Sequence, residues 1–242
     1  MTFSVVARCP RTGQLGVAVA TAVPAVGSMC PFARAGVGAV STQSWVNPYL
    51  ALDALKRMER GASASDALAQ VMETDEGREL RQIGVIDAQG RSAAWSGNSC
   101  TDWYGHIAEP GFAVQGNMLV SGATVESMAR AMRASEPLDL AERLLLTMEA
   151  GEAAGGDKRG RQSASMMVVD AEDYPLIDLR VDEHHHPIAE LRRVWGVAKL
   201  QLLPFVQGMP KKGRPGEPAP DHVVKMLGVA PPYRPGGGGS AP

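Results

Sequence analysis

Residues 1–21, MTFSVVARCPRTGQLGVAVAT, decide the fold at the start of this chain. Phe3–Arg8 and Gln14–Thr21 are short runs rich in the residues that strands favour. The segment between them, Cys9-Pro-Arg-Thr-Gly13, has the proline and glycine that are typical of a turn. The stretch therefore predicts an antiparallel β-hairpin.

Thr2 follows the initiator methionine directly and precedes the first predicted strand. Once Met1 is removed, the hydroxyl and the α-amine of Thr2 form a complete nucleophile and base pair. An α-amine has a pKa of roughly 7.7–8.0, so a useful fraction of it is neutral near pH 7. The alternative is that a small residue simply follows Met1, and this stretch alone does not separate the two interpretations.

The composition is that of an ordinary soluble globular protein, with 242 residues, 45% hydrophobic and 21% charged. A net charge of −2 gives no electrostatic reason to expect a nucleic acid or an anionic membrane as partner. The three cysteines have no C-x-x-C spacing, so neither a disulfide framework nor a zinc site is indicated. We expect a cytoplasmic protein that uses no metal and no cofactor.

Residues 15–33 carry no charge and are long enough to resemble a membrane span. Pro24 and Pro31 interrupt them, and the first half alternates like a strand, so we expect a buried strand followed by a loop. Arg8 and Arg11 lie where a signal peptide would be apolar. We therefore expect neither a signal peptide nor a membrane partner.

The rest of the chain alternates between groups of strands and pairs of helices. Further strands are predicted at 36–43, within 81–97 as a hairpin, and at 112–117, 163–170 and 175–181. Helices are predicted at 48–60, 67–72, 123–133, 138–152 and 187–199. This order favours a layered sandwich built from antiparallel hairpins. The chain lacks the glycine-rich dinucleotide, P-loop and G-x-S-x-G motifs, which argues against those sites.

The composition changes near the C-terminus, where proline and glycine become frequent. We expect a first domain over residues 1–200 and a mostly flexible tail over 201–242. One apolar run, 223–229, predicts a helical turn within the tail. The terminal GGGGSAP resembles a linker and is left out of the fold prediction.

Polar residues at the ends of predicted strands are candidates for chemistry. The amide of Asn117 can donate to a developing oxyanion. In GGDKRGRQS (155–163), Asp157 can orient the Thr2 amine and Arg161 can pair with a substrate carboxylate. Ser41 can line a pocket, and His106 can bind substrate. For each, a turn former, a solvated charge or a local hydrogen bond is the alternative.

Eight stretches, in chain order, resemble domain-of-unknown-function family 1028, which is grouped with the N-terminal nucleophile (Ntn) hydrolases. They are TFSVVAR (2–8), LGVAVAT (15–21), CPFARAGVGAVSTQ (30–43), RQIGVIDAQGR (81–91), WYGH (103–106), VQGNML (114–119), AAGGDKRGRQSAS (153–165) and LIDLRVDEHHHPIAELRR (176–193). The resemblance implies an α+β fold of four layers, αββα, with two antiparallel sheets between helix layers. It also implies that Thr2 is the nucleophile, and it makes Gln43, Asn117, Asp157 and Arg161 the best pocket candidates. The family usually carries one histidine where this chain has His184–His186, so we attach no catalytic role to the triplet.

Three functions follow as hypotheses. The first is a homodimeric amidohydrolase that cleaves a C–N bond of a small amide, ureide or acylated amino acid or peptide through an acyl-threonine intermediate. The second is a non-catalytic binding or structural subunit with the same fold. The third is a hydrolase that uses Cys30 or Cys100 as its nucleophile.

Overall fold

Ten strands form two antiparallel sheets in the computed structural model, which describes residues 2–214 and 218–229. The six-stranded sheet has the order β10-β9-β2-β1-β8-β7, and the four-stranded sheet has the order β3-β4-β5-β6. Along the first sheet the bounds are Ile177–Val181, Ser163–Val169, Leu15–Thr21, Thr2–Arg8, Phe112–Asn117 and Gly105–Glu109. Along the second they are Pro31–Arg34, Gly38–Ser44, Arg81–Asp87 and Ser92–Ser96.

The predicted hairpin at the start of the chain is confirmed. β1 pairs with β2 from Thr2↔Thr21 to Arg8↔Leu15, and Gly13 takes the positive φ of 79° that the turn requires. On its other side β1 pairs with β8, with Thr2 opposite Asn117. β1 is therefore a central strand, and Thr2 begins it with a partner on each side.

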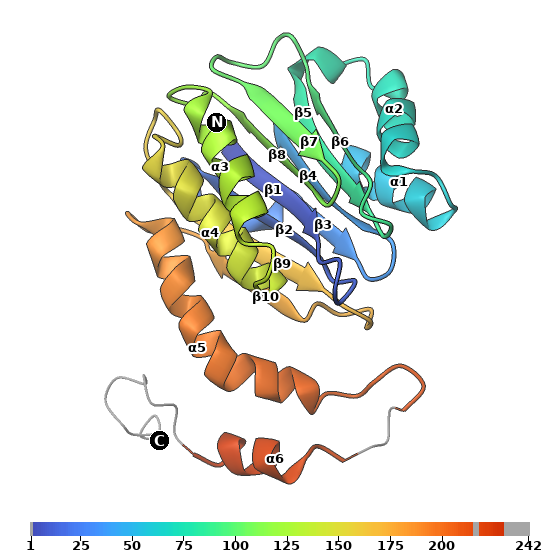
Figure 1. Cartoon of the computed structure of the whole chain (residues 1–242), viewed down its shortest axis with the longest axis vertical. Coiled ribbons are helices and arrows are strands. Elements are labelled where there is room, and N and C mark those ends of the chain that lie inside the picture. The colour runs from blue at the N-terminus through green and yellow to red at the C-terminus, as the bar shows by residue number, and fades with distance from the viewer. Residues whose placement is uncertain (1, 215–217, 230–242) are drawn as a thin grey trace, which may run out of the picture. The chain divides into compact units, whose positions relative to one another are not determined.

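Helices cover the outer face of each sheet (Figure 1). α1 (Pro48–Glu59) and α2 (Ala64–Thr74) pack on the four-stranded sheet. α3 (Ala123–Ala134) and α4 (Leu140–Ala153) pack on the six-stranded sheet. The inner faces of the two sheets contact each other. The expected α+β fold, two antiparallel sheets between helix layers, is thus confirmed.

The space between the sheets has an apolar half and a polar half. Side chains on alternate positions of a strand share a face. Val6, Val17 and Ile86 form an apolar cluster between the sheets. On the same faces, toward the start of β1, lie Ser4 and Thr2, both buried. Buried polar groups need partners, so this half requires a hydrogen-bond network.

Two strands, β3 and β7, were not predicted from the sequence, and both lie at sheet edges. β3 begins with a proline, and Pro is tolerated at an edge because the missing N–H costs no ladder bond. β7 is only partly buried along its length. Edge strands bury fewer side chains, which weakens the pattern that identifies them. Residues 15–33 form β2, then a loop with the 3₁₀ turn Val26–Ser28, and then the start of β3. The expected strand and the loop after it are therefore present.

The chain divides into two compact units, Met1–Val194 and Trp195–Pro242. The last predicted helix is longer than expected: α5 spans Pro187–Gln207 and carries Pro204 within it, whereas its predicted end was residue 199. The apolar run 223–229 does form a helix, α6 (Asp221–Leu227). GGGGSAP lies outside the described residues. Within the described part of the chain, no helix is both long and apolar enough to cross a membrane.

Asp87 joins the turn of the β5–β6 hairpin to the start of α2. Its side chain is buried, and it accepts hydrogen bonds from the N–H groups of Gln89 and Arg91 at 3.0 Å each and of Ala64 at 3.1 Å. The Arg91 guanidinium also lies 2.6 Å from it.

We expect Asp87→Ala to lower the free energy of unfolding by about 3 kcal/mol, because it leaves the buried N–H of Ala64 unpaired and removes two hydrogen bonds from the β5–β6 turn. For a chain of this size that loss lowers Tm by roughly 6–12 °C. Thermal unfolding followed by circular dichroism measures it. Asp53→Ala is the matched control, since it removes only an exposed ion pair with Lys56. Equal Tm values for the two variants would contradict the role of Asp87.

Candidate functional site

Thr2 lies in the polar half of the interior, and hydrogen bonds hold both its side-chain hydroxyl and its backbone carbonyl. Its hydroxyl donates to the hydroxyl of Thr21, its partner on β2, at 3.2 Å. Its carbonyl oxygen accepts from Nε2 of Gln43 on β4 at 3.2 Å. The residue is 6% exposed. The first residue of β1 is therefore held by both sheets rather than frayed.

A buried amide at the centre of the network, Gln82 on β5, sets the direction of its hydrogen bonds. Its Nε2 donates to the carbonyl oxygens of Gly116 at 2.8 Å and Gly105 at 3.2 Å. Carbonyl oxygens only accept, so Oε1 of Gln82 must face the other way and accept. It receives Nε2 of Gln43 at 2.7 Å and Nδ2 of Asn117 at 2.9 Å. Two backbone carbonyls thus orient both candidate amides as donors next to Thr2.

The network continues into the interior through Ser4. Because Nε2 of Gln43 is the donor toward Gln82, its Oε1 accepts, and the hydroxyl of Ser4 donates to it at 2.7 Å. The same hydroxyl accepts from Nε2 of Gln115 at 2.6 Å. Gly84 leaves the room that the Gln115 amide occupies, since a Cβ at that position would collide with the amide. Side chains from four strands are therefore locked into one arrangement.

Asp157 is hydrogen-bonded to the residue that follows Thr21, the strand partner of Thr2. Its carboxylate accepts the N–H of Ala22, which follows Thr21, at 3.1 Å, and the N–H of Arg159 at 2.8 Å. Its side chain is 2% exposed and lies beside the Arg159 guanidinium. Asp157 thus ties the loop after α4 to the end of β2. That it also orients the Thr2 amine stays a prediction.

A cavity of about 260 Å³ lies beside Asp157. Thr21 and Asp157 line it, together with Phe3 and residues of the 155–161 loop. Arg161 lines it as well, half-exposed, with its Nε 3.2 Å from the Glu152 carboxylate and Nη1 3.3 Å from His186. The predicted carboxylate-binding residue therefore reaches the cavity, but part of its charge is already compensated by Glu152.

The two remaining candidates lie outside the centre of the network. Ser41 is fully buried two residues before Gln43 on β4, and its hydroxyl has no hydrogen-bond partner among the described residues. His106 is exposed on β7, and its Nδ1 lies 2.9 Å from the Ser96 hydroxyl. Ser96 in turn accepts from Gln82 at 2.8 Å, so its proton is free to go to His106. His106 contacts the network from outside.

Neither cysteine of the third hypothesis suits nucleophilic catalysis. Burial raises the pKa of the Cys30 thiol to about 12. It also raises the pKa of the Cys100 thiol, which donates to the carbonyl of Arg81 at 3.4 Å. The attacking species is the thiolate, which such surroundings suppress. The structure disfavours a cysteine hydrolase.

Gln82, Thr21 and Ser4 were not recognised from the sequence. Each lies in a strand that is largely buried, and each occupies an inward-facing position next to the candidates. The signal that could have found them is which alternating positions the polar residues occupy along β1, β2, β4, β5 and β8. This alternation shows that the polar residues share one face of their strand, but it does not show which other strands pack against that face. With the network in place, Thr2 offers a buried hydroxyl beside an oriented amide donor, the elements that acyl transfer needs.

Comparison with solved structures gives a strong match and weaker ones. The crystal structure of protein SPO2555 from Silicibacter pomeroyi, described as family-model DUF1028, is 28% identical with a TM-score of 0.84, over 91% of this chain and 96% of that one. Two weak matches are Anbu (ancestral beta-subunit) from Yersinia bercovieri, 14% identical over 85% and 97% of the two chains with a TM-score of 0.39, and an Anbu mutant from Hyphomicrobium sp. strain MC1, 12% identical over 85% and 99% with a TM-score of 0.40. Among curated proteins none matches. The family model for DUF1028, a family of unknown function, matches residues 2–191, and the chain therefore belongs to that family.

Proposed function

We propose that this protein is an amidohydrolase whose nucleophile is the hydroxyl of Thr2, exposed as the chain end by removal of Met1. One observation carries the proposal. Thr2 begins a central strand, where its hydroxyl is hydrogen-bonded to the Thr21 hydroxyl and its carbonyl accepts from the Gln43 amide. Asn117, whose amide is a donor, is its strand partner on the other side. These hydrogen bonds fix the position of Thr2, which an attacking hydroxyl requires. The resemblance to N-terminal nucleophile hydrolases supports the same assignment.

The reaction is acyl transfer through a threonine ester. The hydroxyl of Thr2 adds to the substrate carbonyl while its proton passes to the α-amine of the same residue. The amide of Asn117 donates to the oxyanion. The intermediate collapses, the C–N bond breaks, and the leaving nitrogen takes the proton from the α-ammonium. Water then adds to the ester with the α-amine as base, which releases the acid and regenerates Thr2.

The substrate is a small molecule on this proposal. A cavity of about 260 Å³ is near the lower end of the range for ligand pockets. Lys158 and Arg161 line it together with Glu152 and Asp157, so the charged groups of the lining balance. The best substrates are therefore small amides, ureides or acylated amino acids, and Arg161 is the group that would pair with a substrate carboxylate.

Removal of Met1 is the first requirement, and it can be tested without knowing the substrate. We expect intact-mass analysis to show loss of Met1 and a β-lactone probe to form one covalent adduct, mapped to Thr2 by peptide sequencing. A chain with a retained N-terminal extension is the matched control, because it keeps the hydroxyl but lacks the free amine. It should not be labelled. Equal labelling of the extended chain would contradict the role of the amine.

The alternative function is a non-catalytic binding or structural subunit with the same fold. It predicts a folded protein that keeps Met1 and reacts with no such probe. If the polar network serves only to specify how the two sheets pack, the protein would fold but would not react with the probe. The labelling experiment therefore separates the two functions directly.

A further inference from the structure

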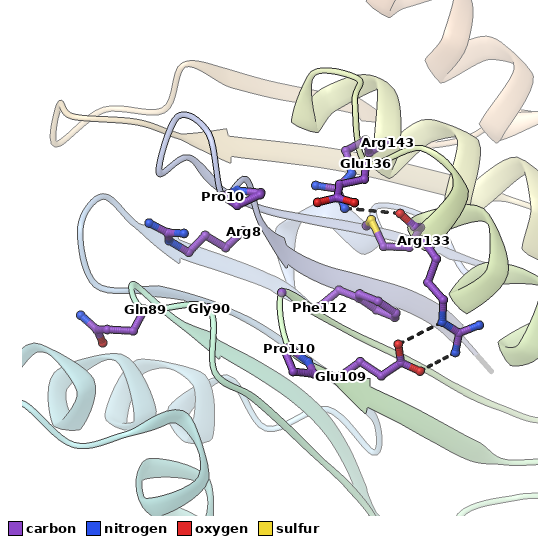
Figure 2. A pocket seen from close by; sticks show the side chains of 12 residues that line it. Arg8, Pro10, Gln89, Gly90, Glu109, Pro110, Phe112, Arg133, Glu136 and Arg143 are labelled. Atoms are coloured by element: carbon purple, nitrogen blue, oxygen red, sulfur yellow. Dashed lines mark hydrogen bonds and ion pairs between the residues drawn. The ribbon is translucent and has the colours of Figure 1, made fainter.

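A second cavity, of about 410 Å³, lies at the end of the six-stranded sheet opposite Thr2 (Figure 2). Arg8 ends β1 and Phe112 begins β8 at this cavity, and α3 and α4 supply further walls. With a rise of about 3.3 Å per residue, the six steps of β1 separate Arg8 from Thr2 by about 20 Å. A ligand here would not touch the candidate site.

Arg143 of α4 lines this cavity as a buried cation with unused donors. It is 5% exposed, and its Nη2 donates to the carbonyl of Met132 at 3.3 Å. Its Nε and Nη1 have no hydrogen-bond partner among the described residues. Burial lowers the pKa of Arg143, opposed by Cys9 and Glu136, yet an arginine stays charged at neutral pH. A buried charge with unpaired donors is costly unless something occupies the site.

Other charges around the cavity do not neutralise Arg143. Arg133, at the rim, is paired with Glu109 through two hydrogen bonds, one of them 3.0 Å long. Glu136 lies beside Arg143 in Figure 2, with no ion pair between them. Arg8 also lines the cavity, and its buried Nε is without a partner in the described part of the chain. The cavity therefore holds two cations against one unpaired carboxylate.

We propose that this cavity binds a small monocarboxylate with an apolar body, whose carboxylate is held by Arg143, while Arg8 adds a second positive charge to the lining. The net charge of the lining calls for one negative charge, and Glu136 and Glu109 would repel a dianion such as phosphate. Phe112 and Met132 supply apolar surface for the rest of the ligand. Guanidinium groups are the usual partners of carboxylates in sites of this kind.

Benzoate is the probe for this site, because it joins a carboxylate to an apolar ring, and benzamide is its neutral counterpart. We expect benzoate to raise the Tm of the full chain with increasing concentration and benzamide to leave it unchanged. Titration should also shift the Nε–H signal of Arg143 in a proton–nitrogen NMR spectrum, assigned by its loss in Arg143→Met. Inorganic phosphate should bind more weakly than benzoate.

Two variants locate the site. Arg143→Met should weaken benzoate binding by about tenfold or more, since it removes charge-assisted hydrogen bonds. It should fold normally because it removes an unpaired buried charge. Arg133→Met, at the same rim, should leave the affinity within about twofold, because Arg133 is already paired. Equal stabilisation by benzoate and benzamide, binding of phosphate alone, absence of binding by any probe, or full affinity in Arg143→Met would each overturn the proposal.

Discussion

Thr2→Ala is expected to abolish turnover while leaving the fold intact. Loss of a catalytic nucleophile lowers kcat by about 10³-fold or more in enzymes that form an acyl intermediate. The substitution removes one hydroxyl from β1 and keeps the backbone that pairs with Thr21 and Asn117. A screen of amides and ureides against the Met-free protein supplies the substrate, and steady-state kinetics then measures the loss.

Two further variants make that result specific to the nucleophile. Thr2→Ser keeps a hydroxyl and an α-amine, so it should retain measurable turnover and reaction with a β-lactone. Thr12→Ala removes a threonine from the exposed turn between β1 and β2 and should leave kcat unchanged. Thr2→Ala with the same Tm and undiminished turnover would remove Thr2 from the mechanism.

Gln82→Met is expected to have the largest effect on stability. Methionine is close to glutamine in size, so the change removes hydrogen bonds without opening a large cavity. The buried carbonyl of Gly116 loses its donor, and the amides of Gln43 and Asn117 lose their shared acceptor. We expect the free energy of unfolding to fall by about 3–4 kcal/mol and Tm by roughly 10 °C.

The same change should reduce turnover on the proposed mechanism. Without Gln82, the Asn117 amide loses the acceptor that fixes the direction of its Nδ2. A mispositioned oxyanion donor lowers kcat by about 10²-fold or more. Gln70→Leu, at an exposed position of α2, is the control and should change the stability by less than about 0.5 kcal/mol. A kcat equal to that of the parent protein would show that Asn117 is oriented by other means or is not used.

The sequence predicted the central elements better than the edges for a physical reason. β1 and β2 bury nearly every side chain, and their apolar runs are bounded by a proline and a glycine, so composition alone identifies them. β3 and β7 pair with one neighbour only and stay partly exposed. Their residues have less to bury, and their patterns resemble loops. The extension of α5 beyond residue 199 was missed because Pro204 favours an earlier end.

Local pattern was sufficient for the first hairpin and for the layered α+β architecture, whereas Thr2 became the candidate nucleophile through the family resemblance. Asn117 was a candidate as a polar residue at the end of a predicted strand, and the family resemblance added Gln43. Their orientation depended on contacts between residues far apart in the chain. Gln82 joins Gln43 and Asn117, 39 and 35 residues away, and its own direction is set by backbone carbonyls of the other sheet. A hydrogen bond needs a donor and an acceptor at one place, and only the packing of the two sheets brings these together.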